Sequence, residues 1–267
     1  MGYPSTGSRY RGETVIDVTD LSFEYDDGPR VFEDLSLTIP EGETVAVLGA
    51  NGTGKTTFLR LLAGLLTPTN GEIRIDGDQD PTVGLTPEIP ADGLFAATVS
   101  EEVAFFPENR GLAVETQVTQ ALEALGITHL ADRIPQALSE GEKRLVTIAS
   151  VLSGDPDVIG LDEPTSGLDE SGWRRLGERL AALDRTVVLV THDTDFAWRY
   201  ADSAVVLTDS GVDREGPIRE ILADSTYDLA GVGLTTPEPV VWARERGIEE
   251  PPRTVAAAVE LIEGEEP

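Results

Sequence analysis

Gly49-Ala50-Asn51-Gly52-Thr53-Gly54-Lys55-Thr56 fits the pattern G-x-x-x-x-G-K-[ST]. The apolar run Thr44-Val45-Ala46-Val47-Leu48 precedes it and is typical of a buried parallel strand. A helical pattern follows, from Lys55 to about Leu65. Glycines between a strand and a helix let backbone N–H groups converge on phosphate oxygens near the helix N-terminus. The segment therefore predicts an α/β fold with a phosphate-binding loop.

The side chains of this loop have the chemistry that a nucleotide requires. We expect Lys55 to hold the β- and γ-phosphates, the Thr56 hydroxyl to ligate Mg²⁺ and Thr57 to contact the α-phosphate. The predicted nucleotide-binding residues of the segment are Gly49, Asn51, Gly52, Thr53, Gly54, Lys55, Thr56 and Thr57.

Two acidic residues follow a second apolar run, Val158-Ile159-Gly160-Leu161-Asp162-Glu163. Ligands of open α/β sheets bind at the carboxyl ends of the strands, where this run would deliver both carboxylates. We expect Asp162 to bind the hydration shell of Mg²⁺ and Glu163 to polarise an attacking water.

The composition excludes several classes of function. The 267 residues include no cysteine, which rules out disulfides, thiolate zinc sites and cysteine nucleophiles. The formal net charge is −29, from 49 acidic and 20 basic residues. Such a surface repels the phosphate backbone, so direct binding to nucleic acid is disfavoured.

The acidic surface also bears on where the protein works. We interpret it as adaptation to a cytoplasm of very high salt, because the Debye length falls to about 3 Å at molar ionic strength. The alternative is an ordinary acidic protein. No run approaches the roughly 18 apolar residues of a membrane span, and residues 1–12 lack the apolar core of a secretory signal. A cytoplasmic location is therefore expected.

Strand and helix patterns continue along the chain. Strands are predicted at residues 13–18, 21–25, 32–39, 158–161, 187–190 and 204–207. The region of about 88–154 reads as helical, with a capping box at Thr98 opening a helix to Phe106, and with helices at 114–125 and 142–152. Two short helical patterns, broken by Pro251-Pro252, lie within residues 234–267, and residues 263–267 form an acidic tail.

Leu138-Ser139-Glu140-Gly141-Glu142-Lys143-Arg144 resembles the signature loop of the ABC-transporter ATPases, usually L-S-G-G-Q. The phosphate loop, this signature, the acidic strand, Ser166-Gly167-Leu168-Asp169 and Thr191-His192-Asp193 occur in the order of that family. The resemblance covers roughly residues 14–225. It implies a P-loop ABC-type ATPase with a mainly parallel core sheet, an N-terminal antiparallel β subdomain, a helical subdomain at about 88–154 and a small C-terminal appendage.

The resemblance also implies ATP as the nucleotide and assigns further site residues. Tyr25 would stack on adenine, and His192 would contact the γ-phosphate and help to hold the water. Ser139 and Gly141 would donate hydrogen bonds to the γ-phosphate across a dimer. The loop of Asp169 would pass signals between the two ATP sites.

A finer resemblance concerns the ATPases of energy-coupling-factor importers, which bring in vitamins and cobalt or nickel ions. Val83-Gly84-Leu85-Thr86-Pro87-Glu88-Ile89-Pro90-Ala91-Asp92-Gly93-Leu94-Phe95 looks like their pattern V-G-x-V-F-Q-x-P-D-x-Q-L-F, and Pro107-Glu108-Asn109 follows. The resemblance implies a groove at residues 90–95 for a transmembrane scaffold, and a separate membrane subunit that binds the substrate. It divides the chain into an ATP-binding domain at 1–230 and an appendage at 231–267, which contributes to ATPase pairing. The protein would lie peripherally on the cytoplasmic face of the membrane.

Three positions depart from the family by becoming acidic. Glu88 stands where a glutamine usually senses Mg²⁺ and water, and its carboxylate can ligate the metal. Glu140 and Glu142 replace glycine and glutamine of the signature, and Gly93 replaces a groove glutamine. A carboxylate beside a triphosphate costs about 1 kcal/mol at 4 Å in bulk water and less in strong salt.

Three functions fit these observations. The first is a transporter ATPase, with Glu163, His192 and Glu88 in the hydrolytic site. The second is a nucleotide-binding regulatory partner with little hydrolysis of its own. The third is a soluble ABC protein of DNA repair or translation, which the acidity and the lack of cysteines disfavour. Homodimer and heterodimer both stay open.

Overall fold

Six strands form the core sheet of the computed structural model, which describes residues 14–26, 28–75 and 82–263. The strands, in spatial order, are β5 (Val83–Thr86), β6 (Val158–Asp162), β7 (Thr186–Val190), β3 (Thr44–Leu48), β8 (Ser203–Thr208) and β9 (Gly211–Pro217). All neighbouring pairs are parallel except β8 and β9. The mainly parallel core sheet that the sequence predicts is thus confirmed.

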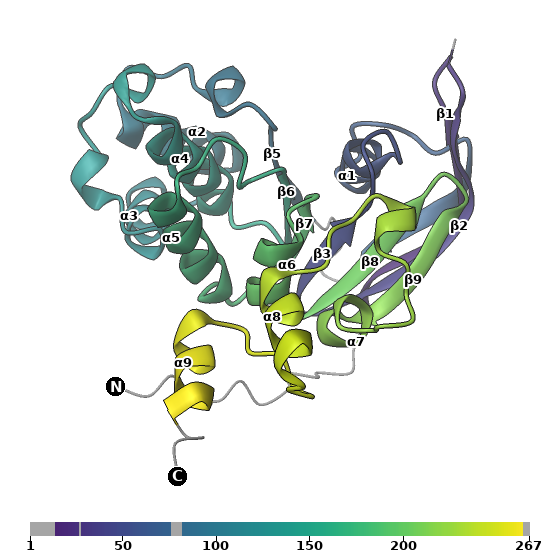
Figure 1. Ribbon diagram of the computed structural model, residues 1–267. Coiled ribbons are helices and arrows are strands. Elements are labelled where there is room, and N and C mark those ends of the chain that lie inside the picture. Colours follow the sequence, from purple (N-terminus) through teal and green to yellow (C-terminus); the bar gives the residue numbers. More distant parts are fainter. Residues whose placement is uncertain (1–13, 27, 76–81, 264–267) are drawn as a thin grey trace.

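A second sheet of three antiparallel strands packs on one side of the core sheet (Figure 1). Its strands are β2 (Arg30–Pro40), β1 (Thr14–Glu24) and β4 (Asn70–Ile75), in that order. Strand β1 corrects the prediction of two strands, because one bulged strand spans both segments. The bulge lies at Asp20, whose φ of 50° shifts the pairing register without ending the strand. Glu13 lies outside the described residues.

The central strands bury both of their faces. In β3, Val45 and Val47 face the antiparallel sheet, whereas Ala46 and Leu48 face the opposite cluster of helices. This follows from the alternation of side chains along a strand. Every residue of β3, β6 and β7 is buried, so their loops start from a rigid edge.

Helix α1 (Lys55–Leu62) leaves the loop after β3 and packs between the two sheets. It ends at Leu62 rather than near Leu65. The reason is Gly64, whose φ of 67° turns the chain so that the N–H groups of Leu65 and Leu66 both reach the carbonyl of Arg60. Leu65 is left 67% exposed.

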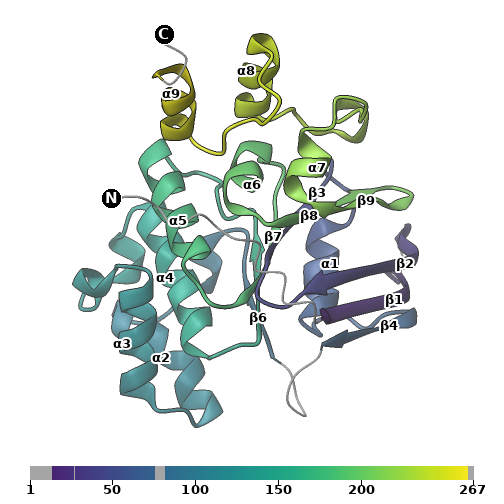
Figure 2. The ribbon, with the colours of Figure 1, turned by 90° about the horizontal axis from the view of Figure 1, so that it is seen from below.

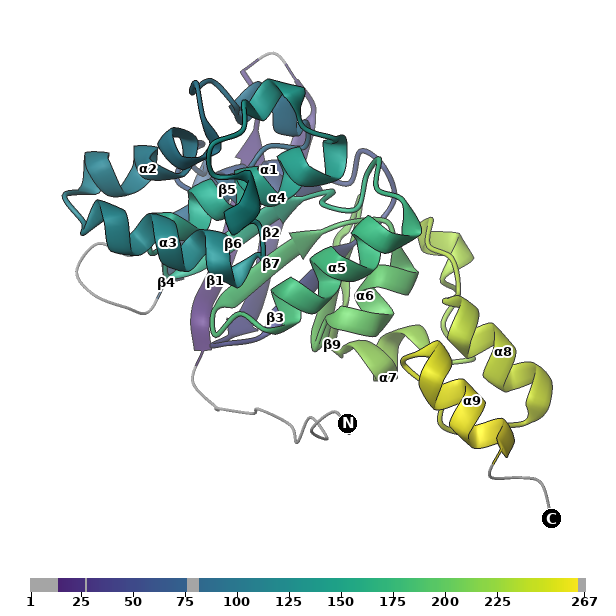
Figure 3. The same cartoon turned by 90° about the vertical axis from the view of Figure 1, so that its left-hand side faces the viewer.

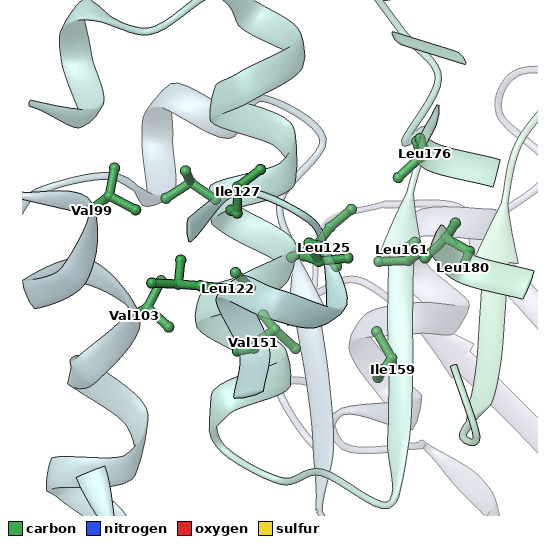
Figure 4. Packing of buried hydrophobic residues seen from close by; sticks show 14 of the residues in the cluster. Val99, Val103, Leu122, Leu125, Ile127, Val151, Ile159, Leu161, Leu176 and Leu180 are labelled. Carbon is green, nitrogen blue, oxygen red and sulfur yellow. The ribbon is translucent and has the colours of Figure 1, made fainter. Parts of the chain in front are cut away.

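The middle of the chain is helical, as predicted. Its elements are η1 (Pro90–Gly93), α2 (Val99–Arg110), α3 (Val114–Ala124), η2 (Thr128–Leu130), η3 (Pro135–Ala137) and α4 (Glu140–Ser153). Figure 4 shows how Val103, Leu122 and Val151 of this region pack toward Ile159 and Leu161 of β6. The capping box of Thr98 and Glu101 begins α2 as expected.

Helix α2 continues beyond its predicted end at Phe106, through Pro107 to Arg110. A proline inside a helix removes the hydrogen bond to the carbonyl four residues earlier. Here that carbonyl, of Val103, accepts a hydrogen bond from the Ser153 hydroxyl at 2.7 Å. Helix α4 therefore satisfies the carbonyl that Pro107 leaves free, and α2 does not have to end.

The remaining helices cover the far side of the core sheet and extend beyond it. They are α5 (Glu170–Ala181), α6 (Thr194–Tyr200), α7 (Ile218–Leu222), η4 (Ala230–Val232), α8 (Glu238–Arg246) and α9 (Val255–Glu263). Figures 2 and 3 show α8 and α9 at one side of the molecule, next to α6 and α7. Trp198 of α6 donates to the carbonyl of Pro252 at 3.0 Å, which anchors the chain between α8 and α9. Of the predicted acidic tail, residues 264–267 lie outside the described part.

Candidate nucleotide-binding and hydrolysis site

Three loops meet where the neighbouring strands β6, β7 and β3 end (Figure 1). They border a cleft of about 490 Å³. Its lining includes these predicted residues: Tyr25, Asn51, Gly52, Gly54, Lys55, Thr56, Thr57, Glu88, Asp162, Glu163 and His192. Residues separated by up to 167 positions in the sequence thus converge at the carboxyl edge of the sheet, where α/β folds bind ligands.

The glycine loop after β3 has a backbone that other residues would not tolerate. Gly49 and Gly54 have φ of 153° and 92°. A Cβ on Gly49 would lie 2.3 Å from the carbonyl oxygen of Leu207, and one on Gly54 would lie 2.7 Å from Phe32. Thr53 is buried and its hydroxyl donates to the carbonyl of Ala50 at 3.0 Å. The loop is therefore held in one shape by its own contacts.

Lys55 is the buried cation at the base of the cleft. Its Nζ donates to the carbonyl oxygens of Gly49 at 2.9 Å and Ala50 at 2.7 Å. Burial lowers the pKa of Lys55, and the carboxylates of Glu163 and Asp162 oppose that shift. The ammonium thus sits inside the loop, where its charge can meet phosphate oxygens.

Tyr25 stands at one wall of the cleft and is 39% exposed. Its hydroxyl lies 3.1 Å from the Thr57 hydroxyl, and Phe23 packs against its ring edge-on at 4.9 Å. These contacts fix the direction of the ring while leaving it accessible. An exposed, oriented ring beside a phosphate-binding loop can stack on a base.

The carboxyl and hydroxyl groups predicted to hold a divalent cation line the same cleft as Lys55. Asp162 is buried, and its Oδ1 atom has no hydrogen-bond partner. Burial raises the pKa of the Asp162 carboxyl, repulsion from Glu88 and Glu163 adds to the rise, and a hydrogen bond with Thr56 opposes it. An orphaned carboxylate oxygen beside a hydroxyl fits Mg²⁺, a hard cation that takes few protein ligands and keeps several waters. The described residues form no cluster of three or more His, Cys, Asp or Glu that could hold a metal by themselves.

Glu163 follows Asp162 in the left-handed region, with a φ of 44°. Such a conformation costs on the order of 1–3 kcal/mol in a residue other than glycine and is found preferentially at functional sites. Its Oε1 atom lies 2.9 Å from Nδ1 of His192, and its Oε2 atom accepts from the Thr191 hydroxyl at 3.1 Å. Both carboxylate oxygens are therefore oriented by the loop after β7.

The predicted signature residues form a second site, away from this cleft. Ser139, Gly141 and Asp169 line another cavity, of about 430 Å³, between α4 and α5. The two cavities share none of the predicted nucleotide-binding residues. A single chain thus does not bring its signature to its own phosphate loop.

Within a single chain, the side chain three positions later engages the signature serine. The Ser139 hydroxyl donates to Oε2 of Glu142 at 2.8 Å, and the Ser139 N–H donates to the same oxygen at 2.9 Å. These hydrogen bonds lower the pKa of the Glu142 carboxyl. Glu142 lies at the third position of α4, which begins two residues earlier than predicted, so the pair forms a capping box. The hydroxyl must leave Glu142 before it can donate to a phosphate.

Sequence reasoning missed two neighbours of the site. Thr191 is fully buried and hydrogen-bonds Glu163, but the sequence marks it only as the residue before His192. Arg144 is also buried; it donates to the carbonyls of Pro87 at 3.3 Å and Ser166 at 3.4 Å, which lie beside the cleft. The contacts of both join segments distant in sequence, and no local pattern announces them.

Comparison with known proteins identifies the family to which the chain belongs. A family model described as "ABC transporter" matches residues 32–166. The energy-coupling factor transporter ATP-binding protein EcfA of Methanocaldococcus jannaschii is 38% identical over 227 residues, covering 79% of this chain and 81% of that protein.

Two solved structures are also similar to this chain. One is cbiO1 from Clostridium perfringens, part of the ABC transporter complex cbiONQ. It is similar with a TM-score of 0.73 and 31% identity, over 86% of this chain and 99% of that one. A dimeric ATP-binding cassette in a post-hydrolysis state bound to ADP and Pi is similar with a TM-score of 0.66 and 26% identity. That match covers 76% of this chain and 99% of the other. No helix in the described part of the chain is long and apolar enough to cross a membrane.

Proposed function

The chain belongs to the ABC transporter family, as an ATPase subunit that couples ATP hydrolysis to transport, and we propose that it powers an importer of the energy-coupling-factor type. Two such subunits, identical or different, close around ATP on the cytoplasmic face of the membrane. They move a transmembrane scaffold, which reorients a separate substrate-binding subunit. The observation that carries ATP hydrolysis by this chain is the convergence of Lys55, Asp162, Glu163 and His192 on one cleft.

The chemistry follows from the positions of these groups. Lys55 binds the β- and γ-phosphates, Thr56 and Asp162 hold Mg²⁺ with its waters, and Glu88 adds a further carboxylate. Mg²⁺, when bound, neutralises phosphate charge during transfer. Glu163 polarises the attacking water, and His192 turns from Glu163 to the γ-phosphate.

The second chain supplies the rest of the site. Ser139 and Gly141 of one subunit meet the γ-phosphate held by the other, because neither residue lies at its own cleft. Asp169 lies on the same wall as this signature and carries information between the two ATP sites. We propose further that residues 231–267 form an appendage to the domain of residues 1–230 and strengthen the pairing. The exposed apolar side chains Val241 and Ile262 support that role.

The importer type is supported by the match to EcfA and to the cbiO1 structure. The cargo is proposed from the sequence resemblance as a vitamin or a cobalt or nickel ion. It is bound by a membrane subunit, so no residue of this chain selects it.

The surface for the scaffold centres on Phe95. Phe95 is 65% exposed, and its ring packs edge-on against Phe105 at 5.0 Å, which in turn contacts Phe106. Exposed aromatic clusters of this kind are typical of protein interfaces. Leu94, which we had expected to share the groove, is only 8% exposed and packs in the core of the helical region. It is therefore unsuited to a surface test.

The experiment is co-purification with the scaffold subunit. We expect Phe95→Asp to abolish capture of the scaffold while ATP hydrolysis by the free ATPase stays at the wild-type rate. Leu65→Asp is the matched control, because Leu65 is equally exposed but lies after α1. Undiminished capture by Phe95→Asp would refute the proposed surface.

The second candidate, a regulatory partner with little hydrolysis, rests on the signature. The Ser139 hydroxyl is engaged by Glu142, and Glu140, paired with Lys143 at 2.7 Å, lines the same cavity. If these charges hold Ser139 back, ATP would close the dimer while an active companion hydrolyses it. The intact cleft of this chain favours the hydrolytic subunit.

A further inference from the structure

A continuous chain of hydrogen bonds leads from α5 to the carboxylate of Glu163. The Trp173 indole N–H donates to Oδ2 of Asp193 at 2.8 Å, and the Asp193 backbone N–H donates to Oγ1 of Thr191 at 3.0 Å. The Thr191 hydroxyl then donates to Oε2 of Glu163 at 3.1 Å. A hydroxyl has one proton to give, and the bond that Thr191 accepts from Asp193 directs that proton to Glu163.

The chain of bonds is shielded from water over its central part. Thr191 is 0% exposed and Trp173 and Asp193 are half-buried, so solvent has little access to replace these partners. Hydrogen bonds in such surroundings are stronger than on the surface, and unmade ones are costly. The orientation of the Glu163 carboxylate is thus set by Thr191 rather than by solvent.

Both the backbone and the ring of Trp173 are held by contacts. Its backbone N–H donates to the carbonyl of Asp169 at 2.9 Å, in the first turn of α5, where the Asp169 side chain caps the helix. Its ring packs edge-on against Phe196 of α6 at 5.1 Å. Asp193 is held as well, because its Oδ1 atom accepts from the N–H of Phe196 at 2.9 Å and caps α6. A displacement of the Asp169 loop would therefore move Trp173 and, through its hydrogen bond, Asp193.

We propose that Trp173 and Thr191 are positioning residues that fix the carboxylate of Glu163 and link it to the turn that carries Asp169. This inference rests on the proposed role of Glu163 in polarising water. In the proposed dimer the Asp169 loop would face the second subunit, so Trp173 would make the orientation of Glu163 depend on the state of that interface. Neither residue lines the cleft, so both should act on the rate of hydrolysis rather than on ATP binding.

Single and paired substitutions in the full-length chain test this proposal. Thr191→Val keeps the shape but removes the hydroxyl, Thr191→Ser retains the hydroxyl, and Trp173→Phe keeps a ring against Phe196 but removes the N–H. The measurements are kcat and KM for Mg-ATP in molar KCl, the Kd of a fluorescent ATP analogue, and Tm. Trp198→Phe is the matched control, because it also removes an indole hydrogen bond, to Pro252, away from the cleft.

We expect Thr191→Val to lower kcat about 10- to 100-fold, by analogy with the loss of a residue that orients a metal ligand. Thr191→Ser should restore most of the rate. Trp173→Phe should lower kcat by a smaller factor, and the double variant Trp173→Phe/Thr191→Val should be no slower than Thr191→Val alone, because both break one chain of bonds. The Kd and KM should stay near the wild-type values throughout, and Trp198→Phe should keep the wild-type kcat.

Two results would overturn the proposal. One is a wild-type kcat in Trp173→Phe. The other is a double variant in which the two losses multiply, since independent effects would then explain both. Glu163→Gln, assayed in parallel, separates this inference from its premise. Full activity of Glu163→Gln would remove the proposed role of Glu163 itself, whereas an inactive Glu163→Gln beside a fully active Trp173→Phe would refute only the positioning role.

Discussion

The imidazole Nδ1 of His192 lies 2.9 Å from Oε1 of Glu163. The His192 side chain is 64% exposed, whereas that of Glu163 is 14% exposed, so the histidine approaches a mostly buried carboxylate from the solvent side. With Thr191 on Oε2, both oxygens of Glu163 are occupied before any nucleotide arrives. In the proposed mechanism His192 turns to the γ-phosphate, which opens Oε1 to the attacking water. We call this pair a latch and expect nucleotide to release it.

His192→Ala tests this latch. Removing the imidazole frees Glu163 but leaves the γ-phosphate without its contact, so we expect kcat to fall by about 100-fold, within the range for a lost acid–base group. The Kd for ATP should change little, because Lys55 and the glycine loop remain. The check is steady-state hydrolysis beside a binding titration. Wild-type turnover in His192→Ala would mean that the histidine is only a loop residue.

Asp162→Asn should make the protein more stable and less active. The raised pKa of Asp162 means that the folded protein holds this proton more tightly than the unfolded chain. Stability therefore falls as the pH rises above the ordinary carboxyl range and through the raised pKa. It stays reduced at neutral pH, where the buried carboxylate is charged. A neutral amide removes that penalty.

For Asp162→Asn in EDTA at neutral pH we expect a higher Tm, by about 2–4 °C for each kcal/mol gained. Addition of Mg-ATP should stabilise the wild type and leave the variant almost unchanged. The measurement is a pair of thermal melts by circular dichroism, with and without Mg-ATP. A lower Tm for the variant in EDTA would show that the carboxylate is not under strain from its neighbours.

Glu142→Gln addresses the signature. The amide oxygen can still accept from Ser139, but more weakly than a carboxylate, so the hydroxyl should be released more easily to a phosphate. We expect a KM for ATP a few-fold below the wild-type value, with the gain largest at the lowest salt at which the protein stays folded. Lys143 forms an ion pair with Glu140 at 2.7 Å, so Glu140→Gln should change the KM less than Glu142→Gln does. An unchanged KM in Glu142→Gln would show that the capping box does not compete with ATP.

The net charge of −29 predicts dependence on salt. In molar salt the Debye length is about 3 Å, so the carboxylates hardly repel one another. In dilute buffer the Debye length is much longer, and the repulsion acts across the surface. We expect helicity, followed by circular dichroism, to be lost on dialysis into dilute buffer and regained in molar KCl. Sucrose at equal osmolality should not replace the salt in full. Complete helicity at low salt would contradict adaptation to a saline cytoplasm.

Local sequence patterns predicted much of the fold. The run of β3 and the glycines after it identified the loop, because an apolar strand, a glycine turn and a helix each have a local signature. The capping box of Thr98 likewise marks the predicted start of α2, whereas the start of α4 at Glu140, capped by Ser139, was not predicted. The order of the motifs supported the resemblance to the ABC-transporter ATPases, and the predicted residues from the phosphate loop to His192 gather at one cleft.

What the sequence could not predict depends on contacts between distant segments. The extension of α2 through Pro107 depends on the hydroxyl of Ser153, which lies 46 positions later in the sequence. The burial of Leu94 depends on packing against the other helices of its region. The bond between Thr191 and Glu163 exists because β6 and β7 are neighbours in the sheet. None of these relations leaves a periodic trace in the sequence.

The most direct test is vanadate-sensitive ATP hydrolysis by the purified chain in molar KCl, measured beside Glu163→Gln. We expect the wild type to turn over ATP and vanadate to stop it. Glu163→Gln should bind ATP with similar Kd but hydrolyse it about 10²- to 10⁴-fold more slowly. A wild-type rate no higher than that of Glu163→Gln would contradict a hydrolytic subunit and favour a regulatory one.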